Sequence, residues 1–364
     1  MSSEAPRLDP SVGPVELTRQ LCDIPSVSGD EASIADAVEE LLKGAAHLAV
    51  TRDGDTLIAR TQLGRERRVI VAGHLDTVPI NENLPVSDRI DAENGEAVIW
   101  GRGTVDMKAG VAVQLALALE LSEPAVDLTW VWYDHEEVAS ELNGLGRALR
   151  RAPELFEADF AILGEPTAGG IEGGCNGTLR ARITMLGRRA HSARGWMGVD
   201  AIHRAAPVLQ RLAEFEAETV TVDGLDYREG LNAVRISGGV AGNVIPDRCD
   251  IEVNYRFAPS RSPEEATAFI RGFFADADEV EIVDLAPGAR PGLDAAIAQS
   301  LVRAVGSEPV AKVGWTDVSR FSALGVPAVN LGPGDPLLAH ADDERVPVAQ
   351  IESVHRALRD WLSA

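Results

Sequence analysis

The sequence predicts an α/β fold in which a smaller domain is inserted into a larger one. In the first half of the chain, short apolar and β-branched runs alternate with helical patterns, as in a largely parallel sheet. From residue 178 onward apolar and polar residues alternate, which is typical of strands with one exposed face. Because 364 residues exceed the size of one ordinary core, we expect two domains.

The elements of the larger domain follow from periodicity and from glycine positions. A helix is expected between residues 26 and 43, with Ser28 or Asp30 as its N-cap and Gly44 as its terminator. Short, mainly apolar runs predict buried strands at 68–72, 128–133 and 158–163, and a longer run of Val, Ala and Leu predicts a helix at 109–121. In a parallel sheet, sites form beyond the carboxyl ends of such strands.

The inserted domain has a different pattern of elements. The sequence predicts, in order, a strand at 178–185, a helix at 200–215, strands at 233–240 and 248–257, a helix at 263–274 and a strand at 279–283. This βαββαβ order is the ferredoxin-like motif of two helices on one sheet. We therefore expect a larger domain of residues 1–177 and 288–364 and an inserted domain of residues 178–287.

Composition excludes several classes of protein. Lys and Arg number 34 against 57 Asp and Glu, and the net charge of −23 argues against binding to nucleic acid or to anionic membranes. The longest apolar runs are too short for a membrane span, and the first ten residues lack the basic and apolar regions of a signal peptide. The sequence thus predicts a cytoplasmic protein.

Five short segments place metal-binding side chains where a strand gives way to a loop. These side chains are His74, Asp106, the adjacent pair Glu136 and Glu137, Glu165 and His340. Imidazole and carboxylate ligands, one of them able to bridge, are what a hydrolytic pair of zinc ions needs. The pattern predicts a metal-dependent hydrolase. Since His340 must lie beside His74 in such a site, the larger domain must be discontinuous.

Each of these residues also has a purely structural explanation. A lone histidine at a strand end is more often structural, but Asp76 lies on the same face as His74 and is able to orient a metal-bound imidazole. Asp106 stands near a helix start, where an N-cap is the better interpretation of that residue taken alone. Adjacent glutamates face different directions, so Glu136 and Glu137 either divide metal binding and proton transfer between them or are simply solvated.

Seven segments of the chain resemble the signature motifs of the co-catalytic zinc amidohydrolases, a family that includes aminoacylases, acetylornithine deacetylase and succinyl-diaminopimelate desuccinylase. In chain order they are GHLDTVP, GRGTVDMKAG, DHEE, GEPT, AHSARGWMG, NVIP and AHADDE. The stretches DHEEVASELNGLG, GEPTAGGIEGGCNGTL and GWTDVSRF are most similar to the desuccinylases within that family. The resemblance covers nearly the whole chain.

The resemblance implies a cofactor and its ligands. It implies two zinc ions per subunit, which cobalt is able to replace, bound in the larger, catalytic domain. Asp106 would bridge the two ions. His74 and Glu165 would complete the shell of one ion, and Glu137 and His340 that of the other.

The resemblance also implies catalytic and substrate-binding roles. Glu136 would be the general base, Asp76 would orient His74, and His191 would reach the partner subunit's site and stabilise the oxyanion. This implies a homodimer in which the inserted domain provides dimerisation and a lid. The residues that would bind the carboxylates of the substrate are Arg256 and Asn243, with Arg194 and Arg320 as further candidates.

The implied reaction is hydrolysis of a small molecule, N-succinyl-LL-2,6-diaminopimelate, to succinate and LL-2,6-diaminopimelate. The alternatives are acetylornithine, another N-acyl amino acid or a dipeptide as substrate, and, more remotely, a non-catalytic metal-binding homologue. Three residues depart from the pattern of the desuccinylases in ways that could reshape the acyl pocket: Cys175, Trp315 and Val318.

Overall fold

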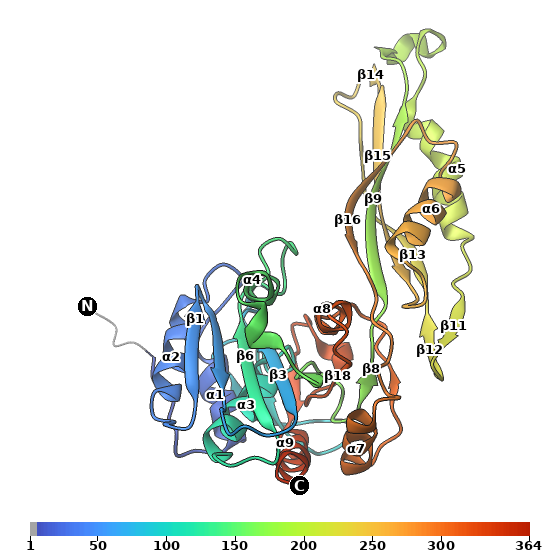
Figure 1. Cartoon of the computed structure of the whole chain (residues 1–364). Coiled ribbons are helices and arrows are strands. Elements are labelled where there is room, and N and C mark those ends of the chain that lie inside the picture. Colours follow the sequence, from blue (N-terminus) through green and yellow to red (C-terminus); the bar gives the residue numbers. More distant parts are fainter. Residues whose placement is uncertain (1–5) are drawn as a thin grey trace. The chain divides into compact units, whose positions relative to one another are not determined.

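The computed structural model describes residues 6–364, which form two compact units (Figure 1). The first unit contains residues 6–173, 292–310 and 320–364, and the second contains residues 174–291 and 311–319. The sequence placed 311–319 in the larger domain, but hydrogen bonds tie this segment to the second unit. The amide of Asn176 donates to the carbonyl of Lys312 at 3.2 Å, and Trp315 Nε1 donates to the carbonyl of Pro287 at 3.1 Å.

Two of the four crossings between the units correspond to the expected ones, and they lie slightly away from the expected positions, at 173/174 and 291/292. The other two, at 310/311 and 319/320, bound the segment 311–319. Cys175 and Ala289 exchange backbone hydrogen bonds of 3.0 Å in each direction, which keeps both of these flanking stretches in the second unit.

The first unit is built on an eight-stranded mixed sheet. Its strand order is β1 (Ala49–Asp53), β2 (Thr56–Arg60), β6 (Asp127–Tyr133), β3 (Arg68–His74), β7 (Phe160–Leu163), β18 (Ala328–Asn330), β8 (Glu172–Gly173) and β17 (Val310–Ala311). Strands β6, β3, β7 and β18 run parallel to their neighbours in this group, as the apolar runs predicted. Their carboxyl ends therefore lie along one edge of the sheet.

Helices cover the sheet and close its core. They are α1 (Pro14–Cys22), α2 (Ala32–Leu42), α3 (Lys108–Glu120), α4 (Gly144–Arg151), α7 (Ala296–Val305), α8 (Val318–Ala323) and α9 (Val348–Leu362), with short 3₁₀ turns η1 (Pro153–Phe156) and η3 (Pro336–Leu338). Alternate strand residues such as Val69, Val71 and Trp130 share one buried cluster with helices α1, α2, α3 and α9. A separate three-stranded sheet consists of β19 (Arg345–Pro347), β5 (Ala97–Trp100) and β4 (Ser87–Ile90).

The expected start of the first predicted helix was wrong. Helix α2 begins at Ala32 with Glu31 in the N-cap position, so neither Ser28 nor Asp30 caps it. The amide of Ser28 instead donates to the carbonyl of Thr77 at 3.1 Å, which ties this stretch to the loop after β3. Long-range bonding, invisible to helical periodicity, decides where this helix starts.

The second unit confirms the predicted βαββαβ order. Its antiparallel sheet has the order β13 (Gly230–Gly238), β15 (Arg248–Phe257), β9 (Gly177–Leu186) and β16 (Glu279–Ala286). Helices α5 (Ala201–Ala213) and α6 (Pro263–Phe273) cover one face and share its buried cluster (Figure 1). The sequence did not predict a hairpin of β11 (Thr219–Val222) and β12 (Leu225–Arg228), or a short pair of β10 (Ala190–His191) and β14 (Val244–Ile245) beside the turn η2 (Ser192–Met197).

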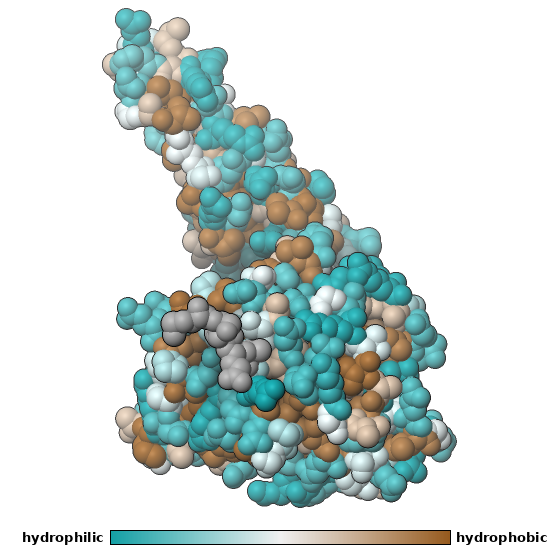
Figure 2. All heavy atoms as spheres, turned by 90° about the vertical axis from the view of Figure 1, so that its left-hand side faces the viewer, coloured by the Kyte–Doolittle hydropathy of each residue, from teal (hydrophilic) through white to brown (hydrophobic). Residues whose placement is uncertain are grey.

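The surface agrees with the charge of the chain. Figure 2 shows hydrophilic side chains over much of one face of the molecule, interrupted by separate hydrophobic patches. Within residues 6–364, no helix is both long enough and apolar enough to cross a membrane.

Candidate metal centre

Three of the predicted ligand segments follow neighbouring parallel strands. His74 is the last residue of β3, the Glu136 and Glu137 pair follows β6, and Glu165 follows β7. In the sheet β3 lies between β6 and β7, with His74 opposite Tyr133 and Ala72 opposite Leu163. The register of the sheet thus carries the three segments to the same edge.

The structure brings four of the predicted ligands into direct contact. His74 Nε2 lies 3.0 Å from Asp106 Oδ1, and His340 Nε2 lies 3.3 Å from Asp106 Oδ2 and 2.9 Å from Glu137 Oε1. Ligand atoms of His74, Asp106 and Glu137 all lie within 4.8 Å of one another. Asp106 therefore stands between the two histidines, one carboxylate oxygen facing each imidazole.

Asp106 does not cap the helix that follows it. Helix α3 begins at Lys108 with Met107 in the N-cap position, and no side chain caps it. The side chain of Asp106 is committed to His74 and His340 instead. The capping alternative is therefore wrong, and Asp106 belongs to the cluster.

Asp76 connects His74 to the two glutamates. Its carboxylate accepts hydrogen bonds from the amide of Glu136 at 3.0 Å and from the amide of Glu137 at 3.1 Å. His74 Nδ1 lies 2.9 Å from the backbone carbonyl oxygen of Asp76 and 3.5 Å from its carboxylate. The main chain of Asp76 is thus the nearer partner of the imidazole, while its side chain holds the turn that carries both glutamates.

Two residues that support this turn were missed as site residues by sequence reasoning. The hydroxyl of Ser28 donates to Asp76 Oδ2 at 2.6 Å. The buried carboxylate of Glu31 accepts the amides of Gly29 at 2.9 Å and His135 at 3.1 Å. The contacts of Ser28 with Asp76 and of Glu31 with His135 join residues that only tertiary structure brings together, so no local pattern in the sequence indicates them.

Electrostatics link the imidazoles to the carboxylates. Hydrogen bonds with Asp106 and Glu137 raise the pKa of His340 to about 10. Burial opposes the charged form of His74, but hydrogen bonds with Asp106 and Asp76 raise its pKa well above the ordinary value. Burial likewise opposes ionisation of Asp106, yet contact with both histidines lowers its pKa. These opposite shifts favour charged imidazoles beside an ionised Asp106.

Three further predicted residues lie together in the second unit. His191 ends β10 and pairs with Val244 of β14, and the amide of Ser192 donates to the carbonyl of Asn243 at 3.0 Å. The ring of His191 accepts the amide of Ala193 through Nδ1 at 3.1 Å. His191, Asn243 and Arg194 are all exposed.

The remaining two predicted residues have different surroundings. Arg256 lies on β15 and is half-buried, and burial lowers its pKa. Among residues 6–364 its guanidinium forms no ion pair, although the charge of Asp284 acts against the effect of burial on its pKa. Arg320, in α8, donates from Nη2 to Ser140 Oγ at 3.0 Å, in the loop that follows Glu137.

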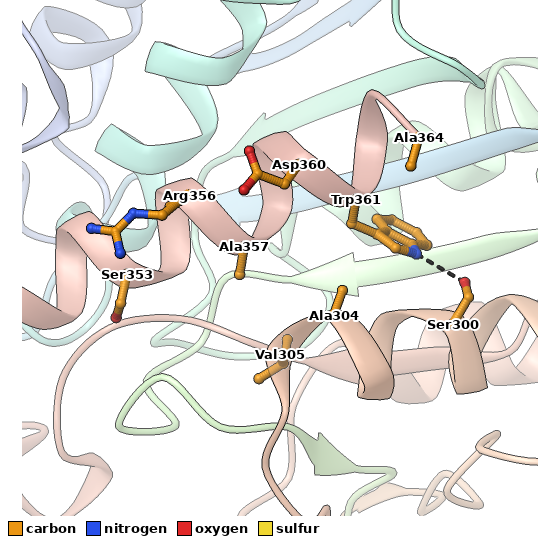
Figure 3. A pocket seen from close by; sticks show the side chains of 9 residues that line it. All are labelled: Ser300, Ala304, Val305, Ser353, Arg356, Ala357, Asp360, Trp361 and Ala364. Carbon is orange, nitrogen blue, oxygen red and sulfur yellow. Dashed lines mark hydrogen bonds between the residues drawn. The ribbon is translucent and has the colours of Figure 1, made fainter.

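The pocket shown in Figure 3 lies away from these residues. It has a volume of about 550 Å³, lies between α7 and α9, and contains a hydrogen bond from Trp361 Nε1 to Ser300 Oγ of 2.9 Å. An adjoining pocket is lined by Ala125 and Val126, which precede β6. Neither lining includes a predicted site residue, and the adjoining pocket marks the amino-terminal edge of the parallel strands, opposite to the cluster.

Comparisons with known proteins identify the class. Residues 70–364 match the model of Peptidase family M20/M25/M40, and the chain belongs to this family. Similar folds occur in a tripeptidase from Staphylococcus aureus (TM-score 0.75, 23% identity, 96% of this chain and 97% of the other) and in an M20 metallo-carboxypeptidase from Sulfolobus solfataricus (TM-score 0.75, 15% identity, 97% and 99%). The predicted fold and hydrolase class are confirmed.

Relatives of higher identity point to one branch of the family. A Mycobacterium tuberculosis protein assigned as succinyl-diaminopimelate desuccinylase DapE is 54% identical over 357 residues, 98% of this chain and 99% of its own length. The succinyl-diaminopimelate desuccinylase of Corynebacterium glutamicum is 46% identical over 374 residues, covering 100% of both chains. The resemblance seen in the motifs is confirmed.

Proposed function

We propose that this protein is a zinc-dependent amidohydrolase that converts N-succinyl-LL-2,6-diaminopimelate to succinate and LL-2,6-diaminopimelate. One observation carries the proposal. The cluster of His74, Asp106, Glu137 and His340 lies in a chain that is 54% identical, over nearly its full length, to a protein assigned that activity. Cytoplasmic residence stays a prediction from the sequence.

The donor set fits a pair of zinc ions, with cobalt as a replacement that such ligands also accept. His74 and Glu165 would bind one ion, Glu137 and His340 the other, and Asp106 both. The short contacts between imidazoles and carboxylates support this proposal, because they bring nitrogen and oxygen donors close enough to share an ion. When bound, the ions supply Lewis-acid activation of water and of the amide carbonyl.

The proton chemistry is assigned to Glu136. It would accept a proton from the attacking water and deliver it to the leaving amine. Asp76 supports this role because its two carboxylate oxygens hold the amides of Glu136 and Glu137, which sets the direction of each side chain. Hydrogen bonds from His74 and Ser28 outweigh the effect of burial and lower the pKa of Asp76 to about 2, so it holds this turn as a carboxylate.

The substrate carries several carboxylates, and the chain carries a net charge of −23. Local cations must therefore overcome the field of the whole protein. Arg256 is the leading candidate because it is half-buried and its guanidinium forms no ion pair among residues 6–364. Guanidinium groups bind carboxylates through two parallel hydrogen bonds. Asn243, Arg194 and Arg320 are the further candidates.

We propose that the protein works as a homodimer in which His191 stabilises the oxyanion in the partner's site. Arg248 and Arg256 are separated by eight residues of β15, about 26 Å at 3.3 Å per residue. His191 and Asn243 lie beyond the Arg248 end of this sheet, where Leu186 pairs with Arg248. One substrate cannot reach both Arg256 and His191 of the same chain, so a second chain would supply one of them.

Exposed apolar residues support an interface on the second unit. Val234 and Ile236 of the edge strand β13 are 58% and 50% exposed, and Ile202 of α5 is 42% exposed. A sheet edge that presents apolar side chains is suited to pairing with a second copy. This surface would hold the two subunits together.

Subunit complementation tests the shared site. Chains with Glu136→Gln and chains with His191→Ala should each form inactive homodimers. After mixing and re-association, half of the dimers are mixed and one of their two sites is intact, so about one quarter of wild-type activity should return. Mixed dimers that form without regaining activity would show that His191 does not act in trans.

Release of primary amine from N-succinyl-LL-2,6-diaminopimelate tests the reaction itself. We expect turnover with zinc, loss after chelation, and no turnover of acetylornithine. Glu136→Gln should lower kcat about 10²- to 10⁴-fold while both zinc ions stay bound. Glu141→Gln, an exposed position in the same loop, is the matched control and should retain activity. Turnover of acetylornithine alone, or full activity of Glu136→Gln, would contradict the proposal.

A further inference from the structure

A buried carboxylate joins two ligand segments that are far apart in the sequence. Glu344 is fully buried and lies four residues after His340. Its Oε1 accepts the backbone amides of Val105 at 2.8 Å and Asp106 at 3.0 Å. Its Oε2 accepts Nη1 of Arg102 at 2.8 Å. One side chain of the segment that carries His340 thus holds the main chain of the segment that carries Asp106.

Arg102 extends this connection. The same Nη1 donates to the carbonyl of Ala341 at 3.2 Å, and Nε donates to the carbonyl of Pro79 at 3.2 Å. The amide of Gly101 donates to the carbonyl of Glu344 at 2.9 Å. Segment 101–106 therefore donates both side-chain and main-chain hydrogen bonds to segment 341–344, and the buried charges of Arg102 and Glu344 compensate each other.

The two backbone amides that donate to Glu344 precede the first residue of α3. Helix α3 starts at Lys108, so the amides of Val105 and Asp106 have no helical partners and need another acceptor. A carboxylate makes stronger hydrogen bonds than a neutral acceptor. Two such bonds fix the peptide planes from which the Asp106 side chain leaves the main chain. The direction of Asp106 toward His74 and His340 then depends on Glu344.

We propose that Glu344 is a positioning residue that sets the distance and orientation of Asp106 relative to His340, and thereby the affinity for the second metal ion. The inference rests on the proposed metal site, in which Asp106 bridges and His340 binds one ion. Glu344 itself touches neither metal nor substrate. Loss of a group that holds a metal ligand in place through hydrogen bonds typically weakens metal binding roughly 10- to 100-fold.

Zinc titration of Glu344→Gln, in the absence of substrate, tests the proposal. Glutamine has nearly the same shape, but its amide group must face either the two backbone amides or the guanidinium of Arg102, and all of these are donors. We expect the second equivalent of zinc to bind roughly 10- to 100-fold more weakly, and excess zinc to restore turnover. Glu352→Gln, the same change at an exposed position on α9, should bind both ions like the wild type.

Each outcome has a distinct meaning. A folded Glu344→Gln that binds both zinc ions with wild-type affinity would overturn the proposal. If that variant does not fold, Glu344→Asp gives the same measurement, because it keeps the charge beside Arg102 but withdraws the oxygens from the amides by one methylene. Weaker zinc binding by Glu344→Asp supports the proposal, and unchanged binding overturns it.

Failure of the proposed reaction can be recognised separately. A wild-type chain that binds two zinc ions but does not hydrolyse the succinyl substrate refutes the substrate assignment, while the zinc titration still decides the role of Glu344. A wild-type chain that binds fewer than two zinc ions refutes the metal pair, and with it the positioning role.

Discussion

Substitution of Gly110 by alanine should displace the main chain that precedes Glu165. A Cβ atom at Gly110 would lie 2.2 Å from the carbonyl oxygen of Gly164, at least 1.2 Å short of the 3.4 Å at which ordinary contact begins. Gly332 also packs closely against this carbonyl, since a Cβ built there would lie 2.2 Å from the same oxygen, so movement of the carbonyl toward Gly332 is restricted. Helix α3 and the end of β7 must therefore separate by about this amount.

The Gly110→Ala substitution should affect both the stability and the turnover of the protein. Overpacking of this kind lowers the free energy of unfolding by about 1–3 kcal/mol. Because Gly164 directly precedes Glu165, a shift of about 1 Å would also misplace a proposed metal ligand, and misplacement on this scale can lower turnover about 10²-fold. The effect on turnover should thus exceed what the loss of folded protein explains.

Urea unfolding and turnover of the succinyl substrate, measured on the same preparation of Gly110→Ala, check both effects. The matched control is Gly272→Ala in α6, where a Cβ atom has nothing within 4 Å. A helical Gly to Ala change without a clash should raise stability by about 0.5–1 kcal/mol. Wild-type stability and turnover in Gly110→Ala would refute the reasoning from close approach.

Three further predictions concern charge, substrate binding and assembly. The pKa of His340 in the folded protein is about 10, against an ordinary value of 6.5. In metal-free protein the contribution of His340 to stability is therefore complete below pH 6.5 and is lost as the pH rises through 10. The Tm measured in chelator should fall across this pH range, and it should fall less in His340→Ala. If Tm falls equally with pH in the wild type and in His340→Ala, His340 does not cause the loss of stability. Arg256→Lys keeps the charge but loses the two-pronged donor, so KM should rise about tenfold with a smaller change in kcat, and an unchanged KM would exclude Arg256 from substrate binding. Ile236→Glu places a charge on the exposed edge strand β13, and sedimentation should show monomers where the wild type shows dimers; dimers of the variant would place the interface elsewhere.

Local pattern was sufficient for the elements that have strong periodicity. The strand 248–257 has the predicted limits, and the helices expected at 109–121 and 263–274 occur at 108–120 and 263–273. Side-chain alternation and helical repeats are written in neighbouring residues, so the chain specifies them without reference to distant parts. The residues of the proposed metal site could be predicted because their types are suited to zinc and three of the five segments that carry them follow predicted strands.

Partner choice between distant residues required the folded chain. The sequence treated Ser28 and Asp106 as potential helix caps, but each side chain has a partner that sheet register and loop packing bring near: Asp76 for Ser28, and His74 and His340 for Asp106. The hydrogen bonds that Glu344 accepts from the main chain of Val105 and Asp106 likewise depend on the packing of distant segments. Residues determine which bonds a side chain is able to make, whereas the packing of distant segments determines which of those bonds forms.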